Sequence, residues 1–296
     1  MTTPFDVNDE AAYQAWREQK LAHRPATLGE LLVEIVDPFA MTSGEVEGIL
    51  SRCARANMAL FRWVRPEAGR GNPLPAITAQ LGVNDLDRNL GAGEEGLSAL
   101  TPGGSAFSPF AAYIPYRAAA IGWHTDGYYN PSHRPVQTLC LYCERPAQAG
   151  GDNELLDHEL LYIRLRDAHP EAVRALMVPD VMTIPARLHA DGAVARPERP
   201  GPVFSVTPAG HLHMRFTNRT KSIRWREDAA TGRALAVLRE CLAAPSPDIF
   251  RGRLETGWGL ISNNVLHTRA AFQDPPDAPA RILYRARYFD RLPAST

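Results

Sequence analysis

The stretch Trp123-His124-Thr125-Asp126-Gly127-Tyr128-Tyr129 places an imidazole and a carboxylate two residues apart. In a β-strand, the side chains of residues i and i+2 point to the same face. His124 and Asp126 can therefore offer a nitrogen and an oxygen ligand, side by side, to a divalent metal ion. Such a pair occurs by chance in many proteins, so its meaning depends on what the rest of the chain supplies.

The best candidate for a third ligand is His267, in the segment Asn263-Asn264-Val265-Leu266-His267-Thr268-Arg269. It lies far from His124 in the chain, so the site would form only on folding. Two histidines and one carboxylate, with other coordination positions open, are the ligand set of non-haem Fe(II) oxygenases. His211 and His213 offer a different pair, of the kind a cupin would use, but no suitably spaced glutamate follows them.

A row of arginines follows His267. In an extended strand over residues 281–289, Arg281, Leu283, Arg285 and Arg287 share one face. Such a face suits a polar pocket better than an apolar core. Arginine is the side chain that binds a carboxylate through two parallel hydrogen bonds. The pattern therefore indicates an anion site close to the metal site.

The composition is that of an ordinary globular protein. The 296 residues are 45% hydrophobic and 22% charged, with a formal net charge of −1. This charge gives no bulk reason to expect a nucleic acid or an anionic membrane as partner. No apolar run approaches the roughly 18–20 residues that span a bilayer, and the first residues lack the features of a signal peptide. We expect a cytoplasmic protein that binds neither nucleic acid nor membrane.

Two local features have ordinary explanations that we favour. Cys140 and Cys143 form a C-x-x-C inside an apolar strand, and no second pair exists that would complete a zinc site, so we expect reduced structural thiols. The basic run from Arg215 to Arg226 contains Phe216 and Trp225, as in some nucleic-acid binders. In a nearly neutral chain, a solvated strand edge or a polar wall of the site is the better explanation.

The predicted secondary structure changes near residue 110, from mainly helical to mainly strand-like. Residues 1–109 are mainly helical in pattern, including a capping box of Thr42 and Glu45 that opens a helix expected to run to about Trp63. Residues 91–109 are rich in Gly, Ser and Pro and form either a lid or a simple connection. Residues 110–296 contain many short strand-like runs, which indicates a β-sandwich or barrel core in an α+β protein. No linker is evident, so we expect a single domain over 1–296.

Three motifs together carry a resemblance to a known family. They are Trp123-His124-Thr125-Asp126-Gly127, Gly150-Gly151-Asp152-Asn153, and Asn264-Val265-Leu266-His267-Thr268-Arg269-Ala270-Ala271-Phe272 followed by Arg281. Over roughly residues 110–290 the chain resembles the Fe(II)/2-oxoglutarate-dependent dioxygenases of the taurine dioxygenase and γ-butyrobetaine hydroxylase superfamily. The resemblance implies a double-stranded β-helix (a cupin-like jelly-roll) core with N-terminal and inserted helices.

The resemblance also implies an activity and its cofactors. These are hydroxylation of a small polar metabolite, with Fe(II), O2 and 2-oxoglutarate, which is decarboxylated to succinate and CO2. By position, His124, Asp126 and His267 match the iron ligands. Arg281 matches the arginine that binds the distal carboxylate of 2-oxoglutarate, and Asn153 matches a residue that supports this co-substrate. Relatives are commonly dimers or larger, so a homo-oligomer is possible.

The substrate stays open at this point. Arg285 matches a position that contacts an anionic substrate group in some relatives, although a second 2-oxoglutarate contact or a structural ion pair would explain it equally. Tyr128 and Tyr129 either pack a turn or line the substrate pocket, where two rings suit a cationic ammonium group. Asp126 argues against halogenation, because related halogenases lack this carboxylate. Desaturation or carbon–heteroatom cleavage at the same iron, and a catalytically silent jelly-roll that only binds or senses a ligand, are the alternatives to hydroxylation.

Overall fold

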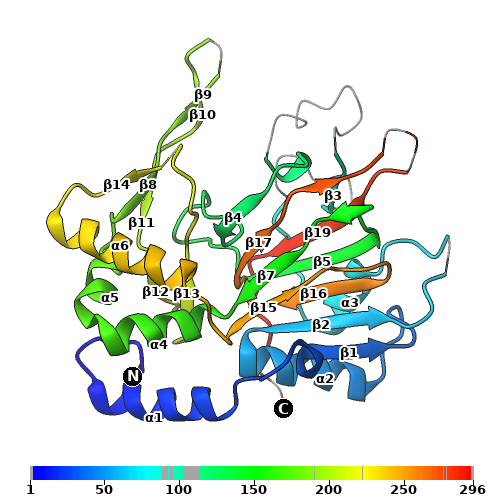
Figure 1. Ribbon diagram of the computed structural model, residues 1–296, viewed down its shortest axis with the longest axis horizontal. Coiled ribbons are helices and arrows are strands. Elements are labelled where there is room, and N and C mark those ends of the chain that lie inside the picture. The colour runs from blue at the N-terminus through cyan, green and yellow to red at the C-terminus, as the bar shows by residue number, and fades with distance from the viewer. Residues whose placement is uncertain are drawn as a thin grey trace. The chain divides into compact units, whose positions relative to one another are not determined.

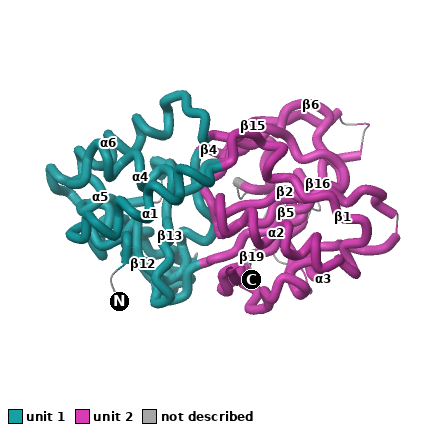
Figure 2. Tube along the Cα trace, turned by 90° about the horizontal axis from the view of Figure 1, so that it is seen from below, with its two compact units in different colours: residues 1–24, 123–135, 156–248 teal, residues 25–122, 136–155, 249–296 magenta. Residues whose placement is uncertain are grey.

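The computed structural model describes residues 3–67, 69–88, 93, 96–102, 114–189, 191–221, 223–275, 277 and 279–294. The chain divides into two compact units, each made of three segments (Figure 2). Unit 1 comprises Met1–Arg24, Trp123–Pro135 and Leu156–Asp248. Unit 2 comprises Pro25–Gly122, Val136–Leu155 and Ile249–Thr296.

Unit 2 is built on a six-stranded sheet with the order β1-β2-β16-β5-β19-β3. Its strands are β1 (Leu32–Ile35), β2 (Met58–Trp63), β3 (Ser98–Leu100), β5 (Thr138–Arg145), β16 (Trp258–Ser262) and β19 (Ile282–Tyr288). β1 and β2 are parallel, and the other neighbours are antiparallel. Helices α2 (Ser43–Ala56) and α3 (Leu74–Gln80) cover one face, where Ile49, Ile77 and Phe61 belong to one buried apolar cluster (Figure 1).

A second sheet has the order β15-β7-β17-β4. Its strands are β15 (Ile249–Gly252), β7 (Asn153–Leu156), β17 (Leu266–Arg269) and β4 (Ile121–His124), and a short pair joins β6 (Ala149–Gly150) to β18 (Phe272–Gln273). A second buried cluster includes Leu141 and Leu260 from the first sheet and Leu155 and Phe250 from the second. Apolar side chains from both sheets thus share one core, as a β-sandwich requires. Short 3-10 turns, η1 (Leu28–Leu31) and η2 (Ile114–Tyr116), lie in the connections.

Unit 1 contains four helices and several very short strands. The helices are α1 (Glu10–Ala22), α4 (His158–Ala168), α5 (Pro170–Leu176) and α6 (Ala229–Ala243). The strands are β8 (Met182–Ile184), β9 (Arg187–Leu188), β10 (Val194–Arg196), β11 (Arg199–Gly201), β12 (Phe204–Val206), β13 (Leu212–Met214) and β14 (Arg224–Trp225). Buried Lys20 on α1 forms ion pairs with Asp157 and Glu159 at the start of α4, at 2.6 and 2.5 Å. These pairs fix α1 to α4.

The structure corrects one boundary in the N-terminal part. The capping box is confirmed, since Thr42 accepts from the Glu45 amide while the Glu45 carboxylate accepts from the Thr42 amide. However, the helix ends at Ala56 and does not reach Trp63. Asn57 adopts a left-handed conformation (φ 55°), which stops the helix, and the following apolar run forms strand β2.

Three other expectations have different outcomes. No helix in the described ranges is both long and apolar enough to cross a membrane. Within the segment 91–109, Ser98–Leu100 is strand β3, whereas residues 91–92, 94–95 and 103–109 lie outside the described residues, so the choice between a lid and a simple connection is not decided. The expectation of one domain over 1–296 stays a prediction.

Candidate metal and co-substrate site

The His124-Asp126 pair lies at the end of β4 in unit 1. The Nε2 atom of His124 and the Oδ1 atom of Asp126 are 4.0 Å apart, as residues i and i+2 on one face should be. Hydrogen bonds hold the backbone that carries the pair. The Thr125 amide donates to the Phe216 carbonyl at 2.9 Å, and the Trp123 indole donates to a carbonyl of α6 at 3.1 Å. These bonds fix the positions from which the two side chains project.

His267 lies on β17 in unit 2 and is buried. Its Nδ1 atom lies 3.1 Å from the carbonyl oxygen of Val265. Because a carbonyl can only accept, this contact selects the tautomer in which Nδ1 carries the proton. In that tautomer the lone pair that can bind a metal ion is on Nε2, which is the usual arrangement of a histidine ligand.

The Gly-Gly turn before Asn153 packs against the segment that follows His267. Gly150 has φ 72°, and a Cβ atom there would lie 2.3 Å from the Ala271 carbonyl oxygen. The Gly151 amide donates to that same carbonyl at 3.1 Å. Position 150 therefore accepts only glycine. The absence of a side chain there lets the turn approach the segment that follows His267. The turn places Asn153 at the start of β7, where its side chain donates to the Thr268 carbonyl at 2.8 Å.

The guanidinium of Arg281 is buried and forms no ion pair among the described residues. The Asp274 carboxylate lies nearby, but it accepts from the backbone amide of Arg281, at 2.9 Å. The guanidinium carbon lies 5.0 Å from the centre of the Phe272 ring, and the Nη1 atom is buried without a hydrogen-bond partner among the described residues. Burial lowers the pKa of Arg281 below its ordinary value. An anionic ligand at this guanidinium would offset the cost of its burial.

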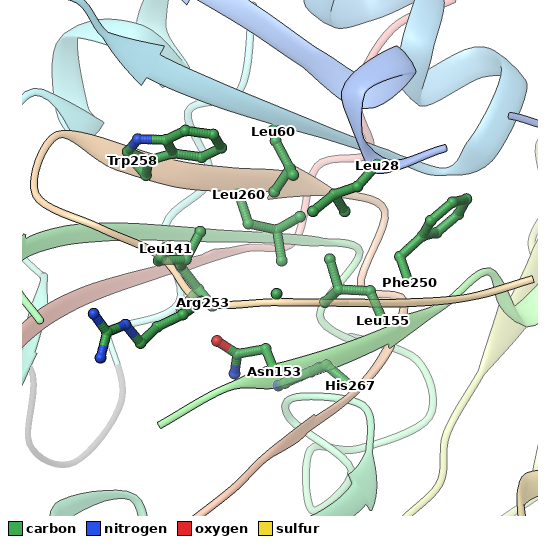
Figure 3. A pocket seen from close by; sticks show the side chains of 12 residues that line it. Leu28, Leu60, Leu141, Asn153, Leu155, Phe250, Arg253, Trp258, Leu260 and His267 are labelled. Carbon is green, nitrogen blue, oxygen red and sulfur yellow. The ribbon is translucent and has the colours of Figure 1, made fainter. Parts of the chain in front are cut away.

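Two cavities in unit 2 connect the predicted residues. One is lined by Arg281 and Asn153 together with the glycines of the turn. The other is lined by Asn153 and His267 and is walled mainly by leucines, among them Leu141 and Leu155 (Figure 3). Asn153 thus belongs to both cavities. A ligand with a charged end at Arg281 and its other end toward His267 would pass Asn153.

Arg253 also lines both cavities, and sequence reasoning missed it. It lies between β15 and β16 in a segment without a recognisable motif, and its guanidinium donates to Glu255 at 2.8 Å. That pair neutralises Arg253. Arg253 therefore differs from Arg281, whose guanidinium forms no ion pair among the described residues.

The predicted row of arginines is buried, but only two of its members lie on β19. Arg281, Arg285 and Arg287 are all at most 9% exposed. Arg281 precedes the first residue of β19, and the pairing of β19 with β5 is irregular between Ile282 and Leu283, so a shared face with Arg281 stays a prediction. The guanidinium of Arg287 pairs with the carboxylate of Asp87 at 2.7 Å, so Arg287 is a structural cation. The role suggested for Arg285 stays a prediction.

Tyr128 and Tyr129 have basic neighbours in unit 1. Their rings meet edge to face at 5.4 Å. Arg219 donates to the Tyr128 hydroxyl at 3.0 Å, and the Arg215 Nε atom donates to the Tyr128 carbonyl at 2.7 Å. Cations beside the ring make this a poor place for an ammonium group. Elsewhere in the basic run from Arg215 to Arg226, Arg224 pairs with Glu198 at 2.8 Å. This pair neutralises part of the positive charge of the run.

The four cysteines are confirmed as free thiols. Cys53, Cys140 and Cys143 are buried, and Cys241 is half-buried. Burial raises the pKa of Cys143 to about 12. The C-x-x-C is therefore part of the core of unit 2, as expected.

Comparison with known proteins identifies the family. Residues 99–287 match the model of the taurine catabolism dioxygenase TauD, TfdA family. The chain is similar to a uridine-5′-phosphate dioxygenase of a Streptomyces species, with 30% identity over 256 residues covering 84% of each chain. It is also similar to a uridine-5′-phosphate dioxygenase of an Amycolatopsis species, with 32% identity over 58% of this chain and 62% of that protein's length.

The fold is shared with solved structures of oxygenases. An asparagine oxygenase in complex with Fe(II), hydroxyasparagine and succinate superimposes with a TM-score of 0.53, at 17% identity, over 93% of this chain and 91% of the other. The likeness confirms the jelly-roll core in an α+β protein. The chain belongs to the TauD/TfdA family of Fe(II)- and 2-oxoglutarate-dependent dioxygenases.

Proposed function

We propose that His124, Asp126 and His267 hold the catalytic Fe(II). Their ligand atoms lie within 4.8 Å of one another. Among the described residues, no other group of three or more His, Cys, Asp and Glu side chains is arranged so that it could hold a metal ion. Two imidazoles and one carboxylate suit Fe(II) and leave coordination positions for the co-substrate and O2. When bound, the iron supplies the oxidising chemistry that converts 2-oxoglutarate into succinate and CO2 and hydroxylates the substrate.

We further propose that Arg281 binds the distal carboxylate of 2-oxoglutarate and that Asn153 supports the molecule along its length. The observation that carries this proposal is the buried Nη1 atom of Arg281, which has no hydrogen-bond partner among the described residues. Asn153 uses one amide hydrogen on the Thr268 carbonyl, which leaves the second for a ligand. Leu141 and Leu155 wall the cavity beside Asn153 and would keep water from the reacting end of the co-substrate.

For the substrate we propose a nucleoside 5′-monophosphate, with uridine 5′-monophosphate as the first candidate. Both curated relatives are named as uridine-5′-phosphate dioxygenases. The arginines beside Tyr128 favour an anionic ligand over a cationic one. Arg285 on β19 is also buried, and a contact between it and an anionic group of the substrate stays a prediction.

The test is an aerobic reaction of the iron-loaded protein with 2-oxoglutarate and uridine 5′-monophosphate, followed by mass spectrometry. We expect succinate in equal amount to the product. A gain of one oxygen indicates hydroxylation, a loss of two hydrogens indicates desaturation, and release of inorganic phosphate indicates carbon–heteroatom cleavage. Succinate formation that does not rise when the nucleotide is added would contradict the proposed substrate. A protein that binds iron and 2-oxoglutarate but forms no succinate with any tested metabolite would favour the binding or sensing alternative.

A further inference from the structure

Three arginines gather where the short strands of unit 1 meet. Arg187 on β9 and Arg196 on β10 are direct partners across an antiparallel pair. Arg199 begins β11 a few residues later, opposite Ile184 on β8. Like charges placed directly opposite each other destabilise a sheet. An anion bound beside Arg187 and Arg196 would reduce the repulsion between them.

Two of these arginines lack a carboxylate partner in the described part of the chain. The Nη1 atom of Arg196 and the Nε atom of Arg199 are buried and make no hydrogen bond there. Arg196 donates only through Nη2, to the Pro185 carbonyl at 2.6 Å. The acid nearest in sequence, Glu198, is already paired with Arg224 at 2.8 Å. Burial lowers the pKa of Arg196, and the charges of Arg187 and Arg199 lower it further.

The cluster is connected to the segment that carries the metal ligands. Buried Arg215 donates to the carbonyl of Arg199 at 2.8 Å and to the carbonyl of Tyr128 at 2.7 Å. It thereby joins β11 to the residues that follow Asp126. Arg215 also donates to the Met182 and Gly201 carbonyls. Its role is therefore structural, and its neighbours are the candidates for binding an anion.

The aromatic pair after the metal ligands has a cation of the same unit beside it. Arg219 donates to the Tyr128 hydroxyl at 3.0 Å, and the rings of Tyr128 and Tyr129 meet edge to face at 5.4 Å. These contacts, like the bonds of Arg215 to Arg199 and Tyr128, lie within unit 1. The arginine cluster is therefore joined to the segment that carries His124 and Asp126.

We propose that Arg196 and Arg199, with Arg187 beside them, bind the phosphate group of the substrate. This inference rests on the proposed function, since it explains how a nucleoside 5′-monophosphate is told apart from the nucleoside. A phosphate monoester carries nearly two negative charges and three acceptor oxygens, and arginine forks match that geometry. The residues lie in the inserted segment between β7 and α6, outside the jelly-roll strands.

The experiment measures binding to the protein loaded anaerobically with Fe(II) and 2-oxoglutarate. Calorimetric titrations with uridine 5′-monophosphate and with uridine compare the wild type with Arg196→Gln, Arg199→Gln and the control Arg17→Gln. Arg17 lies on α1 of the same unit and pairs with Asp167 at 2.7 Å, so its loss frees no acid beside the cluster. Each of the first two substitutions should weaken nucleotide binding at least about tenfold and leave uridine binding unchanged, because each removes a charge-assisted contact. Arg17→Gln should bind both as the wild type does.

Thermal unfolding gives a second readout that a structural role would not produce. Arg196→Gln removes both a like-charge repulsion and the bond to the Pro185 carbonyl, so each protein is compared with itself in phosphate-free buffer. Inorganic phosphate should raise the melting temperature of the wild type more than that of the variant, which responds only through the general effect of phosphate on proteins. Equal nucleotide affinity in Arg196→Gln and the wild type, or equal losses for nucleotide and uridine, would overturn the proposal.

The two proposals fail in different ways. If the wild type does not bind uridine 5′-monophosphate, the proposed substrate is wrong. A phosphate-dependent gain in melting temperature that is larger in the wild type than in Arg196→Gln would still support the anion site. Equal gains in the two proteins would overturn the anion site as well.

Discussion

Replacing Arg281 should weaken 2-oxoglutarate binding without harming the fold. Arg281 is 4% exposed, and its Nη1 atom has no hydrogen-bond partner among the described residues. A hydrogen bond to a charged group contributes about 1.5–3 kcal/mol, so Arg281→Met should raise the dissociation constant of 2-oxoglutarate by about 10- to 150-fold. Arg281→Lys keeps the charge and loses the planar fork, so its effect should be intermediate.

Stability separates this role from a structural one. Burial and, after it, the charge of Arg281 together lower the pKa of Arg269 to about 10. Removing Arg281 therefore relieves a repulsion, and the co-substrate-free variant should unfold at no lower temperature than the wild type. A structural arginine would instead leave a destabilised protein.

The assay is an anaerobic titration of the Fe(II)-loaded protein with 2-oxoglutarate, followed by the weak visible charge-transfer band of the chelate. Arg251→Met is the control, because Arg251 is exposed and already pairs with Glu154 at 2.8 Å. It should bind 2-oxoglutarate as the wild type does. A dissociation constant for Arg281→Met within twofold of the wild type would refute the assignment of Arg281.

Three further predictions concern the scaffold. Burial raises the pKa of Glu45, but bonds from the Val36 and Thr42 amides outweigh it and hold the pKa below its ordinary value. The stability advantage of wild type over Glu45→Gln should therefore be present above about pH 4.3 and decline as the pH falls further. An advantage independent of pH would contradict this. At pH 8 a thiol reagent should modify half-buried Cys241 before buried Cys143, whose modification should require unfolding; equal rates would contradict the burial. Gly150→Ala should lower the free energy of unfolding by at least about 1 kcal/mol in chemical denaturation, because position 150 has a positive φ and a blocked Cβ. Gly44→Ala, where a Cβ meets nothing within 4 Å, is the control, and an equal effect of the two would contradict the argument.

Local spacing in the sequence was enough to predict much of the structure. The i, i+2 spacing of His124 and Asp126 predicts a shared face in an extended chain, and the two side chains do lie 4.0 Å apart although Asp126 follows the end of β4. The capping box of Thr42 is equally local, because both of its hydrogen bonds join residues three apart. The alternation of arginines on β19 follows from strand geometry alone. These predictions depend on contacts within a few residues, which a sequence displays directly.

Other features depend on partners that are distant in the chain. The run Met58–Trp63 is apolar enough for a helix or a strand, and its pairing with β1 and β16 decides for the strand. Spacing gave no indication of Arg253 at the cavities or of Arg196 opposite Arg187. Ion pairing of the arginines also depends on acids that are distant in the chain. Arg287, for example, pairs with Asp87.

The most direct test of the central claim is an anaerobic titration with Fe(II) in the presence of excess 2-oxoglutarate. We expect one Fe(II) per chain and the visible band of the chelate in the wild type. Asp126→Ala and His267→Ala should lose the band at the same metal concentration, whereas His133→Ala, at an exposed histidine, should keep it. A folded wild type that shows no band, or variants that keep it at full intensity, would contradict the proposed iron site.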